Sequence, residues 1–435
     1  MRSETIAEKI MSEMYEEIKG FISEIIANHR SVDFGEIEDQ VQELSRDFSK
    51  RLADGALEAI DNGYVGRTIE CECGGVMEYH SNVRWTLTSL AGELEIYRAY
   101  YYCKECGSSK IPLDEQLAFE GKHQSIGVRK CIALLGMVEG FQEASKRLKE
   151  LTGVCVSSKE EQLESEEIGK EIGQQEDAEV EAFWSEEKEI SAEVTARRLY
   201  ITTDGVNVRT GKETTKEMKI GSVYETALAK DAIAGDIRYT GGYYKSEALG
   251  KKLYVLALKR GLKTAREIVF LGDGSKWIWV IASYHFPEAV QIVDWYHAEE
   301  RLWSVGRAVY GEGTSAMKKW VKKRLKQLIE GEVEAVIESL SELSSSDDDV
   351  TEQIEDNITY FTNNKERMRY NEYTEKGYHI GSGIVESACK HIVGQRLKQA
   401  GMTWSVEGAD AIIQLRILWK NGEWNRFWKN RRVAA

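Results

Sequence analysis

Two pairs of cysteines that enclose a segment of alternating apolar and polar residues constrain the fold more than any other feature of the sequence. Trp85 and Leu87 alternate with polar residues in the first half of this segment. Leu94 and Ile96 do the same in the second half, and Gly92 before them suits a tight turn. A period of two residues is typical of half-buried strands, so the segment predicts a β-hairpin that brings the cysteine pairs together.

The four cysteines of these pairs have the chemistry of a zinc site. Four thiolates can surround Zn²⁺ as a tetrahedron, and a glycine after each pair permits the tight backbone that such a site requires. We therefore predict a structural zinc ribbon over residues 63–112. The first pair has a one-residue spacer, so His80 is an alternative ligand, and buried or redox-active thiols are an alternative to zinc. The predicted ligands are Cys71, Cys73, Cys103 and Cys106.

Length and composition limit the class of protein. The chain has 435 residues, of which 42% are hydrophobic and 30% charged, which is typical of a globular protein with several domains. We find no apolar run that approaches the roughly 18 residues of a membrane span, and the acidic, amphipathic start is unlike a signal peptide. We therefore expect a cytoplasmic protein with no membrane partner. Only 2 prolines occur, which favours long helices.

Charge is distributed unevenly along the chain. The net charge is −15, yet residues 387–435 carry 9 basic and 3 acidic residues. Residues 156–193 hold 14 acidic residues and 3 lysines, whereas residues 318–326 contain six basic residues in nine. A polyanion such as DNA could therefore bind at selected surfaces only.

The first 62 residues predict helices. Apolar residues recur at steps of three and four, which is typical of an amphipathic helix. Such a stripe packs either in a core or in a dimer interface, so we expect a helical region over residues 1–62 with both alternatives open. The stripe consists of Ile6, Ile10, Met14, Ile18, Phe21 and Ile25.

Residues 113–195 return to a helical pattern with features of a DNA-binding helix-turn-helix. One helix is expected to end before Gly153, and Ser157 or Ser158 can cap the start of the next. The second helix would contact DNA, but its strongly acidic sequence disfavours contact with phosphates. A helical linker or an oligomer interface is therefore the alternative.

From residue 197 onward, strands and helices alternate, which predicts an α/β core. A helix over 247–262 separates the third strand from the fourth. Residues 298–375 are helical and predict an all-α insertion between two parts of the core, 196–297 and 376–435, of which the second ends in a basic, aromatic tail. The predicted strands are 197–204, 216–225, 236–244, 266–273 and 289–294.

Three carboxylates lie where the metal ligands of a catalytic core would be expected. Asp204 and Asp273 each end a predicted strand, and Glu386 opens a helix. Carboxylates from adjacent strands meet at one sheet edge, where their oxygens suit Mg²⁺, and two such ions can catalyse phosphoryl transfer on nucleic acid. Asp294 is an alternative to Asp273, and Asp-Gly turns also follow strands without any catalytic role.

Two long strings in the second half of the chain resemble a known family. They are LGDGSKWIWVIASYHFPEAVQIVDWYHAEERLW and IGSGIVESACKHIVGQRLKQAGMTWS. Both are similar to the transposases of bacterial and archaeal insertion sequences of the ISKra group, which are distant relatives of the Mutator-like DDE transposases. The resemblance extends over nearly the whole chain, including YYYCKECGSSKIPLDE and SIGVRKCIALLGMVEGFQEASKRLKELTG.

The resemblance implies a multidomain α/β protein whose RNase H-like, mixed-sheet catalytic core is interrupted by the all-α insertion. It implies that Asp204, Asp273 and Glu386 are the catalytic acids and that they hold two Mg²⁺ or Mn²⁺ ions. The Mutator-like signature of Asp, two residues and His matches Asp294 to His297. His297 is therefore expected near the scissile DNA, and a buried core histidine is the alternative.

The implied function is that of a DNA transposase. It would bind the terminal inverted repeats of its own insertion sequence, cleave them in a metal-dependent reaction and join them to target DNA. It would act as a homodimer or larger homo-oligomer in the nucleoid-containing cytoplasm of a bacterium or archaeon. Arg396 and Lys398 would contact DNA phosphates, unless their basic face is merely solvated. A transposase-derived DNA-binding protein and an RNase H-like nuclease or resolvase are the alternatives.

Overall fold

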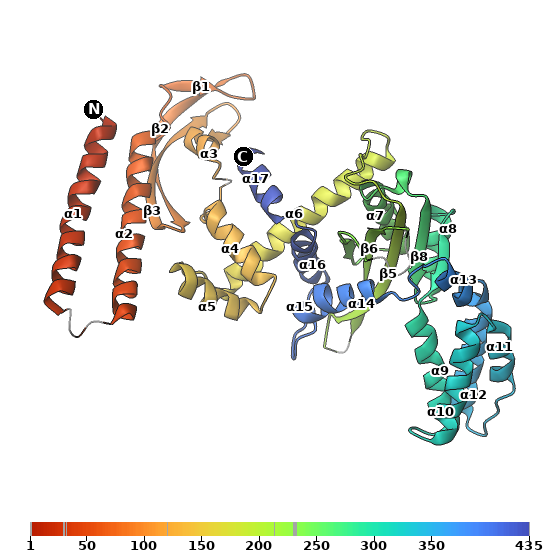
Figure 1. Ribbon diagram of the computed structural model, residues 1–435. Helices are drawn as coiled ribbons and strands as arrows, with labels where there is room; N and C mark the ends of the chain where they lie inside the picture. The colour runs from red at the N-terminus through yellow and green to blue at the C-terminus, as the bar shows by residue number, and fades with distance from the viewer. Residues whose placement is uncertain are drawn as a thin grey trace. The chain divides into compact units, whose positions relative to one another are not determined.

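The chain forms two compact units in the computed structural model (Figure 1). The boundary between them lies inside one long helix, α6 (Ser158–Trp184). The first unit comprises Met1–Ser165 and Asn425–Ala435, and the second comprises Glu166–Trp424. The structure describes residues 2–28, 31, 33–119, 121–212, 214–228 and 233–434.

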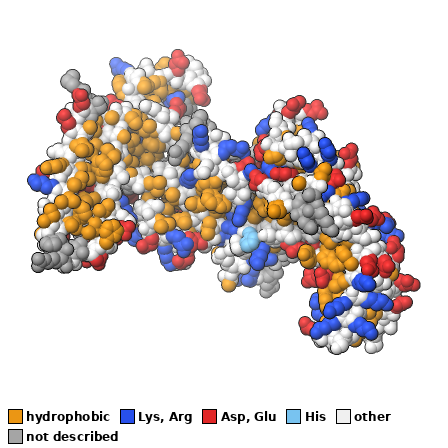
Figure 2. Space-filling model, viewed as in Figure 1, with side chains coloured by type: hydrophobic (Ala, Val, Ile, Leu, Met, Phe, Trp, Pro, Cys, Tyr) orange, Lys and Arg blue, Asp and Glu red, His pale blue; other side chains and the backbone are white. Residues whose placement is uncertain are grey.

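Two helices that pack side by side open the first unit, α1 (Arg2–Asn28) and α2 (Phe34–Ile60). Asp33 caps α2, because its carboxylate accepts a hydrogen bond from a backbone N–H in the first turn. Met14 of the predicted stripe is buried, whereas Ile18 is 49% exposed, so the stripe is only partly used in packing. Figure 2 shows hydrophobic side chains gathered over these two helices.

The predicted hairpin is present in a four-stranded antiparallel sheet of the first unit. The four apolar residues that defined it are all buried, as the alternation predicted, and the structure shows that they form two cross-strand pairs. The strands are β1 (Thr68–Glu70), β2 (Val76–Ser89), β3 (Gly92–Cys103) and β4 (Ser109–Lys110), and the pairs are Trp85 with Ile96 and Leu87 with Leu94.

The remaining helices of the first unit include the two that resemble a helix-turn-helix. The first ends before Gly153, as predicted. The next helix, α6, begins after Ser157. The Ser157 hydroxyl accepts a hydrogen bond from the backbone N–H of Glu160 at 3.1 Å. In return, the Glu160 carboxylate accepts one from the backbone N–H of Ser157 at 2.8 Å. This capping box confirms the predicted helix start. The helices are α3 (Pro112–Leu117), α4 (Ile126–Gly136), α5 (Phe141–Thr152), the first part of α6, and α17 (Trp424–Ala434).

The second unit is built around a five-stranded mixed sheet of order β7-β6-β5-β8-β9. The first three strands in that order pair antiparallel, and the last two run parallel to β5. Every predicted strand is present, but β5 continues past Asp204 to Arg209 because it stays paired with β6. The strands are β5 (Arg198–Arg209), β6 (Thr215–Thr226), β7 (Arg238–Gly242), β8 (Glu267–Gly272) and β9 (Val290–Val293).

Two helices pack with this sheet, α7 (Ser246–Lys259) and α8 (Lys276–His285). Their apolar faces and the strands form one core, in which Leu253 of α7 and Phe270 of β8 are fully buried. The predicted helix over 247–262 is therefore present as α7.

The expected all-α insertion follows β9, and Figure 1 shows its helices as a separate bundle at the edge of the second unit. The basic run 318–326 lies on one of these helices, where Lys318, Lys322 and Lys326 are exposed. The helices are α9 (Trp295–Tyr310), α10 (Ser315–Ile329), α11 (Val333–Ser341), α12 (Asp348–Asn364), the 3₁₀ turn η2 (Lys365–Arg367) and α13 (Tyr370–Glu375).

After the insertion, the chain returns to the sheet and forms the helices that carry Glu386. A π-helical turn interrupts them, a feature that is frequent at functional sites. They are α14 (Gly383–Ala388), the π-helix η3 (Cys389–Gly394), α15 (Gln395–Leu397) and α16 (Val406–Lys420). Among the described residues, we find no helix with the length and apolar character required to cross a lipid bilayer.

We predict that Arg198→Met lowers the free energy of unfolding of the second unit by about 3 kcal/mol. Arg198 is buried in β5 and donates to the Glu267 carboxylate at 2.6 Å and to the backbone oxygens of Lys376 and Gly377. The substitution leaves these acceptors without their donor. Chemical denaturation measures the effect, and Lys251→Met, which removes a more exposed ion pair, should cost at most about 0.5 kcal/mol. Equal effects would contradict the prediction.

Candidate active site and metal centres

The parallel strands of the second unit bring three aspartates to the same end of the sheet. The register pairs Thr202 of β5 with Leu271 of β8, so Asp204 and Asp273 each lie two residues beyond this pair. Asp294 directly follows β9, which pairs with β8 in the same direction. The predicted meeting of carboxylates at one sheet edge is therefore present.

Asp273 lies close enough to Asp204 to influence its ionisation. Burial raises the pKa of Asp204, and the negative charge of Asp273 raises it further. The Asp204 carboxylate accepts a hydrogen bond from the backbone N–H of Gly205 at 2.7 Å. The two oxygens of Asp273 accept from the backbone N–H of Ser275 at 2.7 Å and from its hydroxyl at 3.0 Å. A divalent cation between these acids would relieve their repulsion.

Asp294 has a different environment from the other two aspartates. It is fully buried and caps α9 by accepting from the backbone N–H groups of Tyr296 at 2.6 Å and His297 at 3.1 Å. Its second oxygen accepts from the backbone N–H of Ser382. Burial raises the pKa of Asp294, but interaction with the His297 side chain, followed by hydrogen bonds from Ser382 and from the backbone N–H of His297, holds this pKa below its ordinary value. Both oxygens of Asp294 accept backbone hydrogen bonds in a fully buried position, whereas Asp273 is partly exposed and one of its oxygens accepts only from a hydroxyl, which favours Asp273 over Asp294 as a metal ligand.

His297 and Glu386 complete the cluster. The Nδ1 atom of His297 lies 3.6 Å from Oδ1 of Asp294 and 3.9 Å from Oε1 of Glu386. Interaction with the Asp294 carboxylate, helped by the charges of Asp273 and Asp204, raises the pKa of His297 to about 9. The histidine is half-buried and carries a positive charge at neutral pH, so its environment is not that of a neutral core histidine.

The carboxylates available to a metal are those of Asp204, Asp273 and Glu386. Among the described residues, the acids of the site that join a group of ligand atoms within 4.8 Å of one another are Asp294 and Glu386, together with His297, and not Asp204 or Asp273. A protonated histidine is a poor metal ligand, so a metal between Asp204, Asp273 and Glu386 would require their side chains to move closer together. The side chain of Glu386 is 43% exposed and retains free lone pairs beside its contact with Ser382 at 3.3 Å. Oxygen donors of this kind fit Mg²⁺ or Mn²⁺.

The two predicted DNA-contacting cations lie in different environments. Lys398 is exposed, and its charge is felt at Cys389, next to Asp204. Arg396 is fully buried, with its guanidinium carbon 4.8 Å from the centroid of the Trp404 ring. Since Arg396 has no exposed surface, its expected contact with phosphates is wrong for this conformation, and its role here is in packing.

Sequence reasoning missed two residues that support the site. The Tyr360 hydroxyl, from α12 of the insertion, donates to the backbone oxygen of Asp273 at 2.8 Å. The buried thiol of Cys389, in the π-helix, lies against the Asp204 carboxylate, and burial raises its pKa. We find no signal for Tyr360 in the sequence, because it lies 87 positions from its partner. The three-residue spacing of Cys389 from Glu386 could have indicated a shared helix face.

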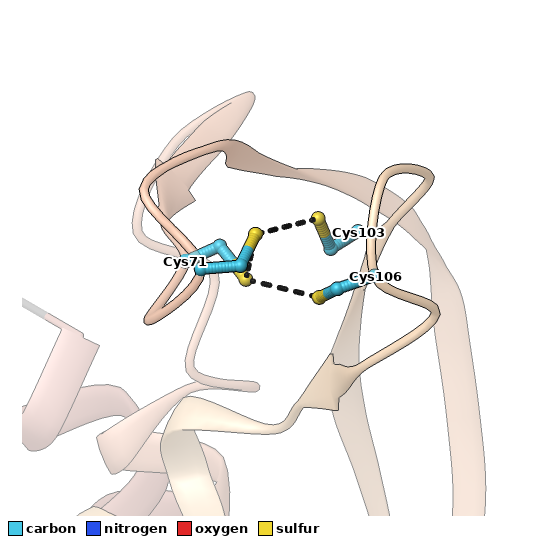
Figure 3. Close-up of side chains that lie close together, drawn as sticks. Cys71, Cys103 and Cys106 are labelled. Carbon is cyan, nitrogen blue, oxygen red and sulfur yellow. Dashed lines mark hydrogen bonds between the residues drawn. The ribbon is translucent and has the colours of Figure 1, made fainter.

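The four predicted zinc ligands converge in the first unit, and Figure 3 shows Cys71, Cys103 and Cys106 facing one another from two loops. Their sulfur atoms all lie within 4.8 Å of one another. The Sγ atom of Cys71 lies 3.5 Å from the Sγ of Cys106 and 3.4 Å from the Sγ of Cys73. The Sγ atoms of Cys73 and Cys103 are 3.8 Å apart. Sulfurs about 2.3 Å from a tetrahedral Zn²⁺ are separated by about 3.8 Å, so the cluster fits the ion.

Two turns hold the cysteine pairs in place. Gly74 and Gly107 follow the pairs with φ of +87° and +78°, a conformation that other residues rarely adopt. The Ser108 hydroxyl lies 2.9 Å from the sulfur of Cys106, and its hydrogen bond lowers the pKa of Cys106 to about 6. A thiolate at neutral pH is ready to bind metal. His80 contacts Ser81 and the Tyr100 ring and is outside the group of four sulfurs.

A model of the family described as "Uncharacterised protein family (UPF0236)" matches residues 28–432. The chain belongs to UPF0236. Two UPF0236 proteins of Caldanaerobacter subterraneus subsp. tengcongensis are each 24% identical over 351 residues, which cover 77% of this chain and 68% and 64% of the relatives. A UPF0236 protein in the vanSb 3′ region of Streptococcus gallolyticus is 23% identical over 355 residues, covering 79% of this chain and 74% of the relative.

Membership in UPF0236 corrects the expectation that the chain belongs to the ISKra group. The two long strings suggested that group, but the family model that matches nearly the whole chain is that of UPF0236, and the relatives bear the same family name. The roles of the site residues therefore depend on their geometry and chemistry.

We predict that Asp294→Asn lowers the pKa of His297 by more than one unit, since it removes the charge that stabilises the protonated imidazole. An NMR titration of the imidazole measures this pKa. Asp236→Asn, at an exposed aspartate, is the control and should leave it unchanged. A pKa of His297 near 6.5 in the unmodified protein would contradict the prediction.

We predict one zinc ion per chain at the cysteine cluster, measured by elemental analysis of the purified protein. Cys103→Ser should reduce the zinc content by at least half and lower the thermal stability of the first unit. Cys155→Ser changes an exposed cysteine outside the cluster and should retain the zinc. Full zinc content in Cys103→Ser, or no zinc in the unmodified protein, would show that the cluster is not a zinc site.

Proposed function

We propose that this UPF0236 protein is a DNA transposase that cleaves and joins DNA by metal-dependent phosphoryl transfer. The observation that carries the proposal is the convergence of Asp204, Asp273 and Glu386, beside the protonated His297, at one end of the mixed sheet. Carboxylates that are open enough to ligate and fixed by regular elements are suited to hold two Mg²⁺ or Mn²⁺ ions.

The topology of the second unit supports an RNase H-like core. Three antiparallel strands are followed by two parallel strands, with Asp204 on the central strand and Asp273 after its parallel neighbour. Helices α9 to α13 lie between Asp273 and Glu386 and would be the insertion into this core. A separate observation, the group of four cysteines, supports a zinc ribbon in the first unit and hence a protein with several domains.

The site residues have distinct parts in this chemistry. Bound divalent ions would activate water or a 3′-hydroxyl and stabilise the leaving oxygen. Asp204, Asp273 and Glu386 would hold these ions. His297, kept protonated by Asp294, is suited to orient a phosphate oxygen or to donate a proton to it. Exposed Lys398 would add a contact to the DNA backbone.

The number of gene loci in the name of one relative supports the proposal that the gene belongs to a mobile element. One Caldanaerobacter relative, 24% identical over 351 residues, has a name that joins eleven loci of one genome. Many copies of one protein in a genome are expected if each copy lies within an element that moves itself. We therefore propose that the DNA partners are the terminal inverted repeats of such an element and its target, bound by a homodimer or larger assembly in the bacterial or archaeal nucleoid.

We predict that the purified protein, with Mg²⁺ or Mn²⁺, cleaves duplexes bearing the ends of the DNA segment that carries its gene and joins them to a second DNA. Asp273→Asn should reduce both reactions on the order of a thousandfold, because it weakens metal binding while keeping the size of the side chain. Labelled oligonucleotides resolved on denaturing gels measure both products.

Controls separate the alternatives. Asp236→Asn alters an exposed aspartate and should leave both reactions unchanged. Repeat-specific binding without cleavage would indicate a DNA-binding protein derived from a transposase, and cleavage without joining would indicate a nuclease or resolvase. Equal activity of Asp273→Asn and the unmodified protein would contradict the site.

A further inference from the structure

A cleft of about 990 Å³ opens next to Asp273, between α8 of the core and α12 of the insertion. Gly274, directly after Asp273, forms one end of its lining. Tyr360 also lines the cleft, and it is the residue whose hydroxyl binds the backbone oxygen of Asp273. The cleft therefore lies next to the backbone of Asp273, although none of the proposed catalytic side chains lines it.

The lining combines positive charge with aromatic rings. The guanidinium carbon of Arg301 lies 3.8 Å from the centroid of the Tyr360 ring, and that of Arg367 lies 4.6 Å from the Trp279 ring. Tyr284, which is 76% exposed, adds an aromatic face that is open to solvent. The lining contains three cations, Arg301, Arg367 and Lys276, and a single carboxylate, that of Asp356.

Two polar groups in the lining are buried without a hydrogen-bond partner among the described residues. They are the indole Nε1 of Trp279, a donor, and Oδ1 of Asn364, an acceptor. Trp279 and Asn364 are 7% and 3% exposed. Buried polar atoms without partners cost free energy. Both atoms lie beneath the surface of the lining, so a bound group would reach them only if lining side chains moved, and the charge and aromatic rings of the lining are the stronger indication of a ligand.

We propose that this cleft binds an unpaired nucleotide of the DNA substrate, next to the phosphate at the active site. An unpaired nucleotide offers what the lining lacks: a flat ring for the aromatic and guanidinium faces, donors and acceptors on the base edge, and a negative phosphate for the cations. A paired duplex keeps its bases stacked and their edges occupied, so it would offer the cleft its phosphates only. This inference rests on the proposed function, because it assigns the bound strand to the DNA that is cut.

The test compares the affinity of the full-length protein for two fluorescent duplexes of the same sequence, one fully paired and one ending in unpaired nucleotides. Anisotropy is measured without divalent metal, so that no cleavage occurs. We expect about tenfold tighter binding of the duplex with unpaired ends. Tyr284→Ala and Arg301→Gln should each reduce this preference about fivefold or more, because each removes one stacking surface of the base. Tyr284→Ala should bind the paired duplex within about twofold of the unmodified protein, whereas Arg301→Gln also removes a charge that can meet phosphates and is assessed by the ratio of its two affinities.

Matched controls are Lys322→Gln, an exposed cation of α10, and Tyr15→Ala, an exposed tyrosine of α1, and both should retain the preference. Tyr284 is largely exposed, so its loss should not affect folding. Equal binding of the two duplexes, or a preference retained in both cleft variants, would overturn the inference.

Parallel cleavage assays distinguish the two proposals. If the protein cuts repeat DNA but shows no such preference, only the cleft assignment fails. If the preference depends on Tyr284 and Arg301 but no DNA is cut under either metal, the cleft assignment stands and the proposed transposase function fails.

Discussion

The buried carboxylate of Asp294 is the interaction on which the arrangement of the site depends. It ends β9, caps α9 and accepts the backbone N–H of Ser382, so it fixes both the start of the insertion and the segment that returns from it. Because the same carboxylate raises the pKa of His297, one buried charge sets the position of that histidine and its protonation.

The two units divide the tasks that the proposed function requires. The second unit supplies a rigid sheet whose parallel strands deliver acids to one edge, and its insertion supports that edge through Tyr360. The first unit contains few large buried side chains around its cysteine cluster, so bound zinc would replace the stability that a larger core provides. The proposed DNA binding is compatible with an overall acidic chain, because exposed cations such as Lys398 and the lysines of α10 provide local positive charge.

Much of the fold could be predicted because it depends on local periodicity. The burial of Trp85, Leu87, Leu94 and Ile96 follows from alternation, although their cross-strand pairing does not. The positions of Asp204 and Asp273 near the ends of strands follow from the apolar runs before them. The burial of Arg396 could not be predicted, since its packing on Trp404 depends on how the chain turns after the π-helix. The continuation of β5 beyond Asp204 depends likewise on its distant partner β6. The functions of the acids themselves remain a proposal, supported by their convergence.

The most direct test is to locate divalent metal in crystals of the protein soaked in Mn²⁺, by anomalous scattering. If Asp204, Asp273 and Glu386 form a metal-dependent catalytic centre, a Mn²⁺ peak will lie within bonding distance of the Asp204 and Asp273 carboxylates. A peak only at Asp294 and His297, or none in the second unit at a Mn²⁺ concentration that supports DNA cleavage, would contradict the assignment of these acids.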